Sequence, residues 1–315
     1  MHILVTGGAG FIGSNLAARL VALGNKVVIL DNFDEYYDPD IKRNNIATLQ
    51  NHAAIVEGDI RDERLVERLY KEYRITHVAH LAGMSGVRYS ITHGNLYADV
   101  NTRGSVVLLD AASKHNIEMF VLASTSSVYG ETTRIPFVED DAAMMPLAPY
   151  PASKRAAELF ARSYHHLFGL NVTVTRFFNV YGPRGRVDMM PLRTIEAILH
   201  QQAIPIYNNG TLERDWTYID DLVNGLLLAL EKPLGYEIFN LGYGNPISLN
   251  RFIHIYEQLM SKRAIVQNVP APLSEPPITY CDNTRARQLL GFDPCIPIEE
   301  GLARTWQWYQ DTHDI

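Results

Sequence analysis

The sequence predicts an α/β protein with a doubly wound parallel sheet and a smaller C-terminal lobe of mixed α+β structure. With 315 residues, the chain is about twice the length of a common single domain. Short β-branched runs, apolar on both faces, alternate with helix-length segments through the first half of the chain. Such runs are typical of buried parallel strands joined by helical crossovers. After Gly182-Pro183 the alternation becomes irregular, which indicates a second unit.

The strands and helices expected from these patterns follow in chain order. Strands are expected at residues 3–5, 26–30, 54–57, 77–80, 119–123 and 172–176. The C-terminal part is expected to hold a helix near 192–201, a strand near 216–219, and helices near 222–230 and 249–260. We divide the chain into a sheet domain of residues 1–180 and a lobe of residues 181–315, and allow for a late strand near 237–240 that returns to the main sheet.

The composition excludes several classes of protein. Hydrophobic residues make up 47% and charged residues 20% of the chain, so a disordered or fibrous protein is excluded. The 28 Lys and Arg against 35 Asp and Glu give a net charge of −7 without long like-charge blocks, and we expect neither a nucleic-acid-binding nor a membrane-binding face. The 11 His residues include no H-E-x-x-H motif, and no metal site is expected. Two cysteines fit a reducing compartment, so the expected location is the cytoplasm.

A glycine-rich turn follows the first expected strand directly. Gly7, Gly10 and Gly13 have the spacing G-x-x-G-x-x-G, and an amphipathic helix begins at the same point. This spacing allows a tight turn, close approach of the backbone to a pyrophosphate, and close packing of helix on strand. The helix N-terminus then holds the anion. Since a strand precedes the turn and a helix follows it, we interpret the motif as a dinucleotide site rather than a flexible turn.

Two acidic residues follow the second and third expected strands. Asp31 ends the second strand, where a carboxylate accepts hydrogen bonds from ribose hydroxyls and repels a 2′-phosphate. Because no Arg occupies positions 31 to 35, NAD is expected rather than NADP. Asp59 has two interpretations, since it can read the adenine amino group or cap the next helix. The sequence does not decide between them.

Tyr150 and Lys154 form a candidate catalytic pair. They lie four residues apart, on one face of an expected helix. A phenol with a pKa near ~10 is a poor base at neutral pH, but a neighbouring ammonium and an oxidised nicotinamide both favour the phenolate. The segment Ser124 to Gly130 ends the fifth expected strand, at the sheet edge where open α/β folds bind their ligands. This context favours a catalytic pair over an ordinary surface pair.

Motifs along nearly the whole chain resemble those of the extended short-chain dehydrogenase/reductases that act on nucleotide sugars, a family with a Rossmann sheet. The matching motifs are Thr6 to Gly13, Asp31-Asn32, Gly58-Asp59-Ile60, His80 to Gly83, Asn101, Thr125 to Gly130, Tyr150 to Lys154, Arg176 to Gly182 and Arg214 to Asp221. Within that family, residues 31–38, 86–90 and 182–189 look most like those of UDP-glucuronate 4-epimerases. The resemblance implies an NAD-dependent epimerase whose substrate is a UDP-sugar.

The resemblance also implies roles for individual residues. Tyr150 is the base, Lys154 its electrostatic partner and ribose ligand, and Thr125 the hydroxyl that binds the reacting sugar oxygen, with Ser126 assisting. Further substrate contacts are expected from Asn179 near the phosphate and sugar, Arg214 at the diphosphate, and Arg186, with Arg88 second, at a sugar carboxylate. The implied cofactor contacts are Gly7, Gly10, Phe11, Ile12, Gly13, Asp31, Asn32, Asp59, Ile60, Leu81, Ala82, Asn101, Tyr150, Lys154 and Phe177.

Two departures from the glucuronate pattern leave the sugar open. Asn179 stands where UDP-glucuronate 4-epimerases usually carry Thr, and Gly83-Met84-Ser85 stands where Ala-Gln-Ala is more usual. The alternatives are therefore a UDP-glucose or UDP-N-acetylglucosamine 4-epimerase and, more distantly, an inactive NAD-sensing scaffold. NADH formation on adding a UDP-sugar would exclude the scaffold.

The expected reaction interconverts UDP-glucuronate and UDP-galacturonate through a bound 4-keto sugar, with no net redox change. Dehydration is not expected, because Ser126 and Ser127 stand where related dehydratases carry acids. The family resemblance also implies a homodimer. Its four-helix interface would be built by the helices near 106–112 and 156–167.

Overall fold

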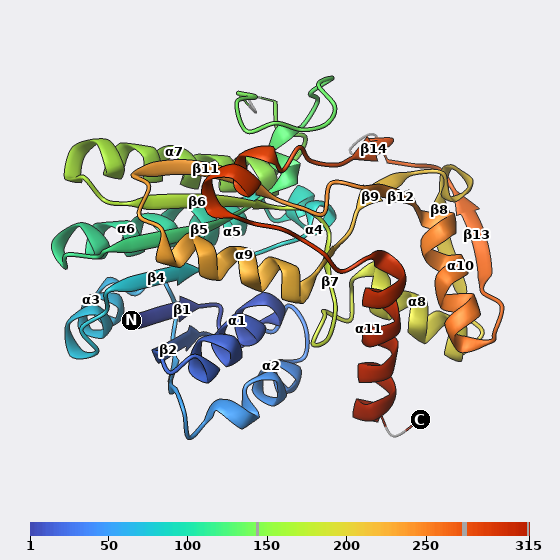
Figure 1. Cartoon of the computed structure of the whole chain (residues 1–315), viewed down its shortest axis with the longest axis horizontal. Helices are drawn as coiled ribbons and strands as arrows, with labels where there is room; N and C mark the ends of the chain where they lie inside the picture. Colours follow the sequence, from blue (N-terminus) through green and yellow to red (C-terminus); the bar gives the residue numbers. More distant parts are fainter. Residues whose placement is uncertain (143–144, 273–275, 314) are drawn as a thin grey trace.

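The computed structural model describes residues 1–142, 145–272, 276–313 and 315. Its centre is a seven-stranded parallel sheet in the order β11-β6-β5-β4-β1-β2-β3 (Figure 1). The strands are β1 (His2–Thr6), β2 (Lys26–Asp31), β3 (Ala54–Glu57), β4 (His77–His80), β5 (Met119–Thr125), β6 (Val172–Phe177) and β11 (Tyr236–Leu241). The six strands expected up to residue 176 are confirmed, and the late strand returns as β11 beside β6.

Helices cover both faces of the sheet, because each connection between neighbouring parallel strands has to cross over it. α1 and α9 pack on one face, and α3, α6 and α7 pack on the other. The helices around the sheet are α1 (Phe11–Ala22), α2 (Pro39–Asn45), α3 (Glu63–Glu72), α4 (Val87–Thr92), α5 (Gly94–Tyr97), α6 (Gly104–Lys114), α7 (Pro149–Phe168) and α9 (Ile219–Glu231). Shorter helical turns are η1 (Ala47–Leu49), η2 (Ala98–Arg103) and η3 (Ser126–Tyr129).

In the described residues, the smaller lobe combines helices with short sheets and lies to the right of the main sheet in Figure 1. The helix expected near 222–230 as part of this lobe forms as α9 but packs against α1 and the main sheet instead. Its helices are α8 (Met190–Leu199), α10 (Leu249–Met260) and α11 (Ile298–His313), with turns η4 (Asn208–Gly210) and η5 (Ala286–Leu290). Its strand groups are β7 (Val180–Tyr181) with β10 (Thr217–Tyr218), β8 (Ala203–Tyr207) with β13 (Ile265–Val269), and β9 (Glu213–Asp215) between β12 (Pro246–Ser248) and β14 (Ile278–Thr279). No helix within the described ranges is both long and apolar enough to span a bilayer.

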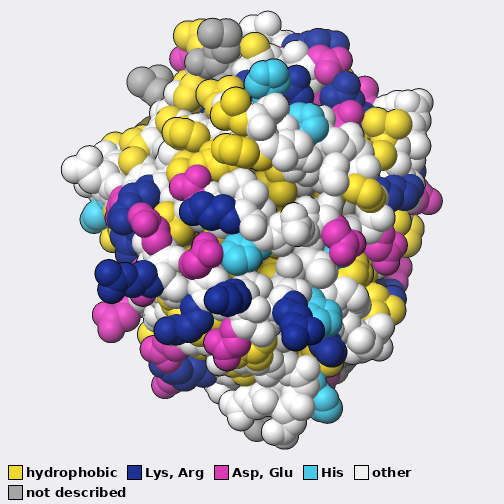
Figure 2. All heavy atoms as spheres, turned by 90° about the vertical axis from the view of Figure 1, so that its left-hand side faces the viewer, with side chains coloured by type: hydrophobic (Ala, Val, Ile, Leu, Met, Phe, Trp, Pro, Cys, Tyr) yellow, Lys and Arg dark blue, Asp and Glu magenta, His cyan; other side chains and the backbone are white. Residues whose placement is uncertain are grey.

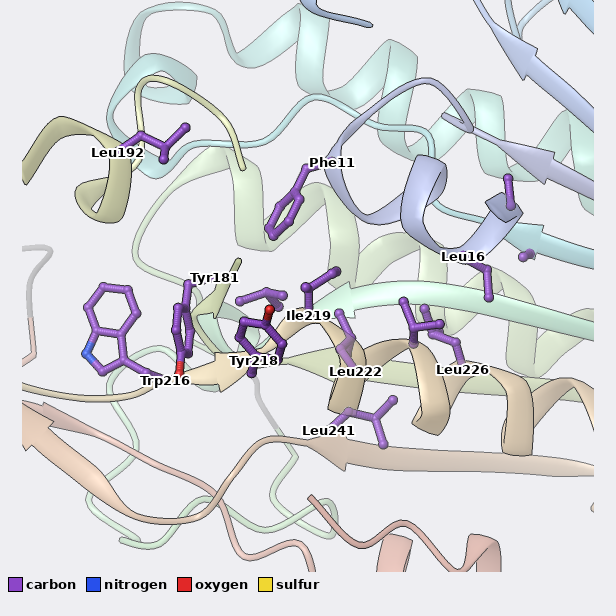
Figure 3. Packing of buried hydrophobic residues seen from close by; sticks show 14 of the residues in the cluster. Phe11, Leu16, Tyr181, Leu192, Trp216, Tyr218, Ile219, Leu222, Leu226 and Leu241 are labelled. Atoms are coloured by element: carbon purple, nitrogen blue, oxygen red, sulfur yellow. The ribbon is translucent and has the colours of Figure 1, made fainter. Parts of the chain in front are cut away.

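The packing of α1 against α9 fixes the position of the α1 N-terminus. Phe11 and Leu16 of α1 lie near Ile219, Leu222 and Leu226 of α9 in one buried cluster (Figure 3). The three α9 residues are spaced three and four apart, so they share one face of the helix. All five side chains are buried. The glycine turn before Phe11 is therefore held between the sheet and a packed helix pair.

Candidate active site

A cavity of about 540 Å³ opens at the carboxyl ends of the central strands. Its walls include the segments that follow β1, β2, β3, β4, β5 and β6. Strand order reverses between β1 and β4, and open α/β sheets bind their ligands at such a reversal. The sequence-predicted site residues that line the cavity are Gly7, Gly10, Phe11, Ile12, Gly13, Asp31, Asn32, Asp59, Ile60, Leu81, Ala82, Thr125, Ser126, Tyr150, Lys154, Phe177, Asn179 and Arg186.

The turn between β1 and α1 fits the pyrophosphate of a dinucleotide. Gly7 has φ +66°, a left-handed conformation that glycine adopts without strain. A Cβ on Gly13 would lie 2.1 Å from the carbonyl oxygen of Gly7, so a larger residue does not fit. Gly10 is the N-cap of α1 and lines the cavity. The backbone and the positive end of the helix therefore face the same space.

Gly13→Ala is expected to weaken dinucleotide binding by at least about tenfold, because the added methyl group forces the turn away from Gly7. Isothermal titration with NAD measures the effect. Gly24→Asn is a matched control, since a Cβ at Gly24 meets nothing within 4 Å and Asn tolerates the positive φ there. Equal affinity of Gly13→Ala and wild type would contradict the proposed role of the turn.

Asp31 both holds the glycine turn and faces the cavity. Its Oδ2 accepts a hydrogen bond from the Ala9 N–H at 3.1 Å, and its Oδ1 accepts one from the Phe33 N–H at 2.9 Å. The ammonium of Lys42 lies 4.0 Å from Oδ1 and donates to the Asp34 carbonyl oxygen at 2.9 Å. The carboxylate is thus fixed at the end of β2, where the sequence predicts the ribose contact.

Asp59 lines the cavity but does not cap a helix. The N-cap of α3 is Asp62, whose side chain accepts hydrogen bonds from the N–H groups of Arg64 and Leu65, so the capping interpretation of Asp59 is wrong. The Asp59 carboxylate instead pairs with Arg61, at 2.7 Å from Nη2 and 2.9 Å from Nε. Hydrogen bonds from Arg61 lower the pKa of Asp59, which keeps it ionised at the cavity edge.

Thr125, Tyr150 and Lys154 meet in the cavity although two different elements carry them. Thr125 is the last residue of β5, and the other two lie on the first turns of α7, which begins at Pro149. The Thr125 hydroxyl hydrogen-bonds the Tyr150 phenol. Lys154 is buried, and the spacing of four residues places it on the same helix face as Tyr150. The arrangement brings a hydroxyl, a phenol and an ammonium to one place.

Burial largely sets the protonation of this group. Burial raises the pKa of the Tyr150 phenol and outweighs the hydrogen bond with Thr125 and the charge of Arg186, which lower it. The lowering of this pKa that is expected from Lys154 together with an oxidised nicotinamide stays a prediction. Burial also lowers the pKa of Lys154 to about 8, against the opposing charge of Glu158.

Arg186 reaches the cavity from the loop between β7 and α8. Its Nε and Nη2 donate to the two carboxylate oxygens of Asp188 at 2.9 Å and 2.5 Å, and its Nη1 donates to Ser85 Oγ. The guanidinium also lies over the Tyr36 ring, 5.4 Å from the centroid. These contacts hold one cation in a fixed orientation near Tyr150. A fixed guanidinium is suited to a carboxylate or phosphate.

Residues 3–242 match the NAD dependent epimerase/dehydratase family, which accounts for both the glycine turn and the Tyr-Lys pair. The chain belongs to this family. A UDP-glucuronate 4-epimerase of Thermodesulfobacterium geofontis is 40% identical over 317 residues, covering 100% of this chain and 98% of the relative.

Solved structures of this family agree in fold. A Bacillus cereus UDP-glucuronic acid 4-epimerase, in complex with UDP-glucuronic acid and NAD, has a TM-score of 0.93 and 33% identity, covering 99% of this chain and 100% of that one. A Thermotoga maritima UDP-glucose 4-epimerase with UDP-glucose has a TM-score of 0.91 and 30% identity, with the same coverage. The cofactor of this epimerase/dehydratase is NAD.

Three predicted site residues of this epimerase/dehydratase lie outside the cavity wall. Asn101 is buried behind it, where its side chain donates to the Met84 carbonyl oxygen and Ser153 Oγ and accepts from the Met84 N–H. Arg88 lies over the Tyr207 ring at 5.1 Å, and Arg214 Nη1 donates to the Glu213 carbonyl oxygen at 2.7 Å. Asn101 thus holds the segment after β4 in place, and the contacts expected of all three remain predictions.

Several cavity residues were missed by the sequence reasoning. Tyr36 and Tyr37 come from the segment between β2 and α2, Lys42 comes from α2, and Asp188 comes from the loop before α8. A sequence signal for Lys42 was available. Asp38 and Pro39 begin a short helix, and this helix places the Lys42 ammonium near Asp31. Asp188 lies in the segment 182–189 that carries the family resemblance, but its contact with Arg186 depends on the course of a loop.

Proposed function

We propose that the protein is a UDP-glucuronate 4-epimerase that interconverts UDP-glucuronate and UDP-galacturonate. The observation that carries the proposal is the meeting of Thr125, Tyr150 and Lys154 with Arg186 in the cavity that the glycine turn borders. The three catalytic groups suit oxidation and reduction at a sugar hydroxyl, and the fixed guanidinium suits a sugar carboxylate. The similarity to UDP-glucuronate 4-epimerases supports the same assignment.

The mechanism follows from the chemistry of the side chains. Tyr150 removes the proton of the sugar 4-hydroxyl, with the Thr125 hydroxyl bound to the same oxygen. Bound NAD supplies hydride exchange at C4. The 4-keto sugar then turns about its linkage to the phosphate and presents its other face. Tyr150 returns the proton to the new hydroxyl, while the charge of Lys154 stabilises the phenolate form between the two transfers.

Epimerisation is favoured over dehydration by the residues beside Thr125. Loss of a hydroxyl needs an acid that protonates the leaving oxygen. Ser126 and Ser127 line the cavity at this point, and neither is a carboxylic acid. The 4-keto sugar is therefore expected to be reduced again before other chemistry takes place.

Incubation with UDP-glucuronate, followed by NMR of the products, tests the proposal. We expect a mixture of UDP-glucuronate and UDP-galacturonate without accumulation of a 4-keto-6-deoxy sugar or a UDP-pentose. A scaffold without activity would return UDP-glucuronate alone. A UDP-glucose 4-epimerase is the second candidate, because Asn179 and Ser85 both lie in the cavity wall and both depart from the glucuronate pattern.

We also propose a cytoplasmic homodimer, formed through α6 and α7. Hydrophobic side chains gather in the upper half of the face in Figure 2, which is the left-hand side of Figure 1, where these helices lie. The exposed hydrophobic side chains of α7 are Leu159, Phe160, Leu167 and Phe168. Leu159 and Leu167 are eight residues apart and share one helix face. Such a patch is typical of a surface that a partner covers.

Leu159→Glu/Leu167→Glu is expected to convert the dimer to a monomer, because two carboxylates would have to be buried in the interface. Size-exclusion chromatography with light scattering measures the mass. Leu23→Glu is the matched control, since Leu23 is 51% exposed at the end of α1 and lies away from α7. A wild-type monomer, or a double variant that remains dimeric, would contradict the proposed interface.

A further inference from the structure

A buried ionic network lies directly beneath the catalytic group. Its centre is Glu158 of α7, which is fully buried. One carboxylate oxygen accepts hydrogen bonds from Ser124 Oγ at 2.5 Å and Arg176 Nε at 3.1 Å. The other accepts from Arg176 Nη2 at 2.8 Å and Arg155 Nη1 at 2.7 Å. A single carboxylate therefore joins β5, β6 and α7.

Each contact of Glu158 lies next to a residue of the cavity wall. Ser124 immediately precedes Thr125 on β5, and Arg176 immediately precedes Phe177 on β6. The two strands are paired here, with Ser124 opposite Arg176 and Thr125 opposite Phe177. Glu158 itself follows Lys154 by one helical turn and shares its face of α7. The Glu158 carboxylate thus holds the residue next to Thr125 and lies one helical turn from Lys154.

We propose that Glu158 is a positioning residue of the active site. Its carboxylate fixes the end of β5 that carries Thr125, and its negative charge keeps the buried Lys154 ammonium protonated. A simple ion pair with Arg176 would stabilise the fold without affecting the charge of Lys154. The inference rests on the proposed catalytic roles of Thr125 and Lys154, but the state of Lys154 can be measured without turnover.

Other ionisable groups lie near this pair. They are Tyr150 and Arg155 of α7, His80 of β4, Arg176 of β6, Tyr129 of η3 and Tyr236 of β11. Burial and the charge of Lys154 hold the pKa of His80 well below its usual value, so that ring stays neutral. Burial raises the pKa of Tyr129 and Tyr150 and raises that of Tyr236 to about 12, so these phenols stay protonated through the neutral and mildly alkaline range. Against the effect of burial, the hydrogen bonds with Glu158 raise the pKa of Arg176, which stays cationic.

Carbamylation by cyanate reports the fraction of Lys154 that is neutral when each rate is divided by the cyanic acid concentration at that pH, because the unprotonated amine reacts with cyanic acid. The purified protein is treated at a series of pH values, and the modification of Lys154 is quantified by peptide mass spectrometry. We expect a midpoint near pH 8 in the wild type, in line with the pKa of about 8 for Lys154. In Glu158→Gln the midpoint should fall by at least about one pH unit.

Two further variants separate charge from packing. Glu158→Asp keeps the negative charge but shortens the side chain, so its midpoint should remain that of the wild type. Glu158→Gln/Arg176→Met removes both fully buried charges, so that the only guanidinium left without the Glu158 carboxylate, among its described partners, is the partly exposed one of Arg155, and this protects the fold if Glu158→Gln is unstable. Its midpoint should still be lowered. Circular dichroism and NAD content identify the folded proteins in which the comparison is made.

The second part of the test is an activity assay, with whichever UDP-sugar the wild type converts. The activity of Glu158→Gln should be lower than that of the wild type by up to about tenfold. This difference should grow as the pH rises, because Lys154 loses its proton at a lower pH in the variant. Any loss of activity in Glu158→Asp should be the same at every pH. The proposal would be contradicted if the carbamylation midpoint of the folded Gln variants were unchanged, or if the loss of activity in Glu158→Gln did not depend on pH. Glu158 would then be only a structural ion-pair partner. A wild type inactive on every UDP-sugar would instead count against the proposed function, and the cyanate arm would still decide the inference.

Discussion

Tyr150→Phe is expected to lower kcat by about 100-fold to 10,000-fold, because the ring is kept and only the group that exchanges the proton is lost. The phenol lies in the cavity, in hydrogen-bond contact with Thr125. The comparison is made by following formation of UDP-galacturonate from UDP-glucuronate. The wild-type rate should rise with pH as the phenol loses its proton, and the variant should lack this rise.

NAD binding separates loss of chemistry from loss of structure in this variant. Tyr150→Phe should retain its NAD, since the glycine turn and Asp31 are untouched. Lys154→Met should also be severely impaired, because it removes the charge that stabilises the phenolate. Activity of Tyr150→Phe within a few-fold of wild type at any pH would remove Tyr150 from the role of base.

Arg186→Ala is expected to lower kcat/KM for UDP-glucuronate by about tenfold to a hundredfold, as for the loss of a charge-assisted bidentate contact. The oxidised sugar has a ketone at C4 and a carboxylate on C5, and such a β-keto acid loses carbon dioxide when the breaking bond aligns with the carbonyl π system. A guanidinium that clamps the carboxylate holds that bond near the ring plane. Asp188 and Ser85 already hold Arg186 in one orientation.

The product of Arg186→Ala should therefore change as well as its rate. Part of the sugar should lose carbon dioxide, gain a proton at C5 and leave as a UDP-4-keto-pentose, with the hydride retained as NADH. Carbon dioxide release and NADH absorbance measure this fraction. UDP-glucose has no carboxylate, so its turnover should fall less than that of UDP-glucuronate, and it serves as the internal control for the effect of Arg186 on the pKa of Tyr150. Equal losses on both sugars, without carbon dioxide, would exclude the clamp.

The parts of the site that follow from local sequence could be predicted. Gly7, Gly10 and Gly13 sit between a strand and a helix, and Tyr150 and Lys154 are spaced by one helical turn. Because parallel strands end at one sheet edge, these segments were expected to meet there, and they do.

The remaining parts depend on loops and on long-range packing. Lys42 enters the cavity from the short helix α2 and Asp188 from a loop, and no periodic pattern predicts where the chain carries either residue. Asn101 is one of the positions that carry the family resemblance, but it lies behind the cavity wall. Its buried amide is needed there to hold the Met84 backbone. Glu158 looks like an ordinary charge at a helical position, and only the pairing of β5 with β6 shows that it is buried against Arg176. The effect of burial on the pKa of Tyr150 could not be predicted, because that burial depends on the folded cavity.

Competition between UDP-sugars tests the central claim most directly. The wild-type enzyme, loaded with NAD, is given equal amounts of UDP-glucuronate, UDP-glucose and UDP-N-acetylglucosamine in one reaction, and the C4 epimers are quantified by NMR. Because Arg186 presents a fixed guanidinium in the cavity, we expect UDP-galacturonate to form first, with a kcat/KM for UDP-glucuronate at least about tenfold above the others. Efficient conversion of UDP-glucose with negligible use of UDP-glucuronate would contradict the assignment.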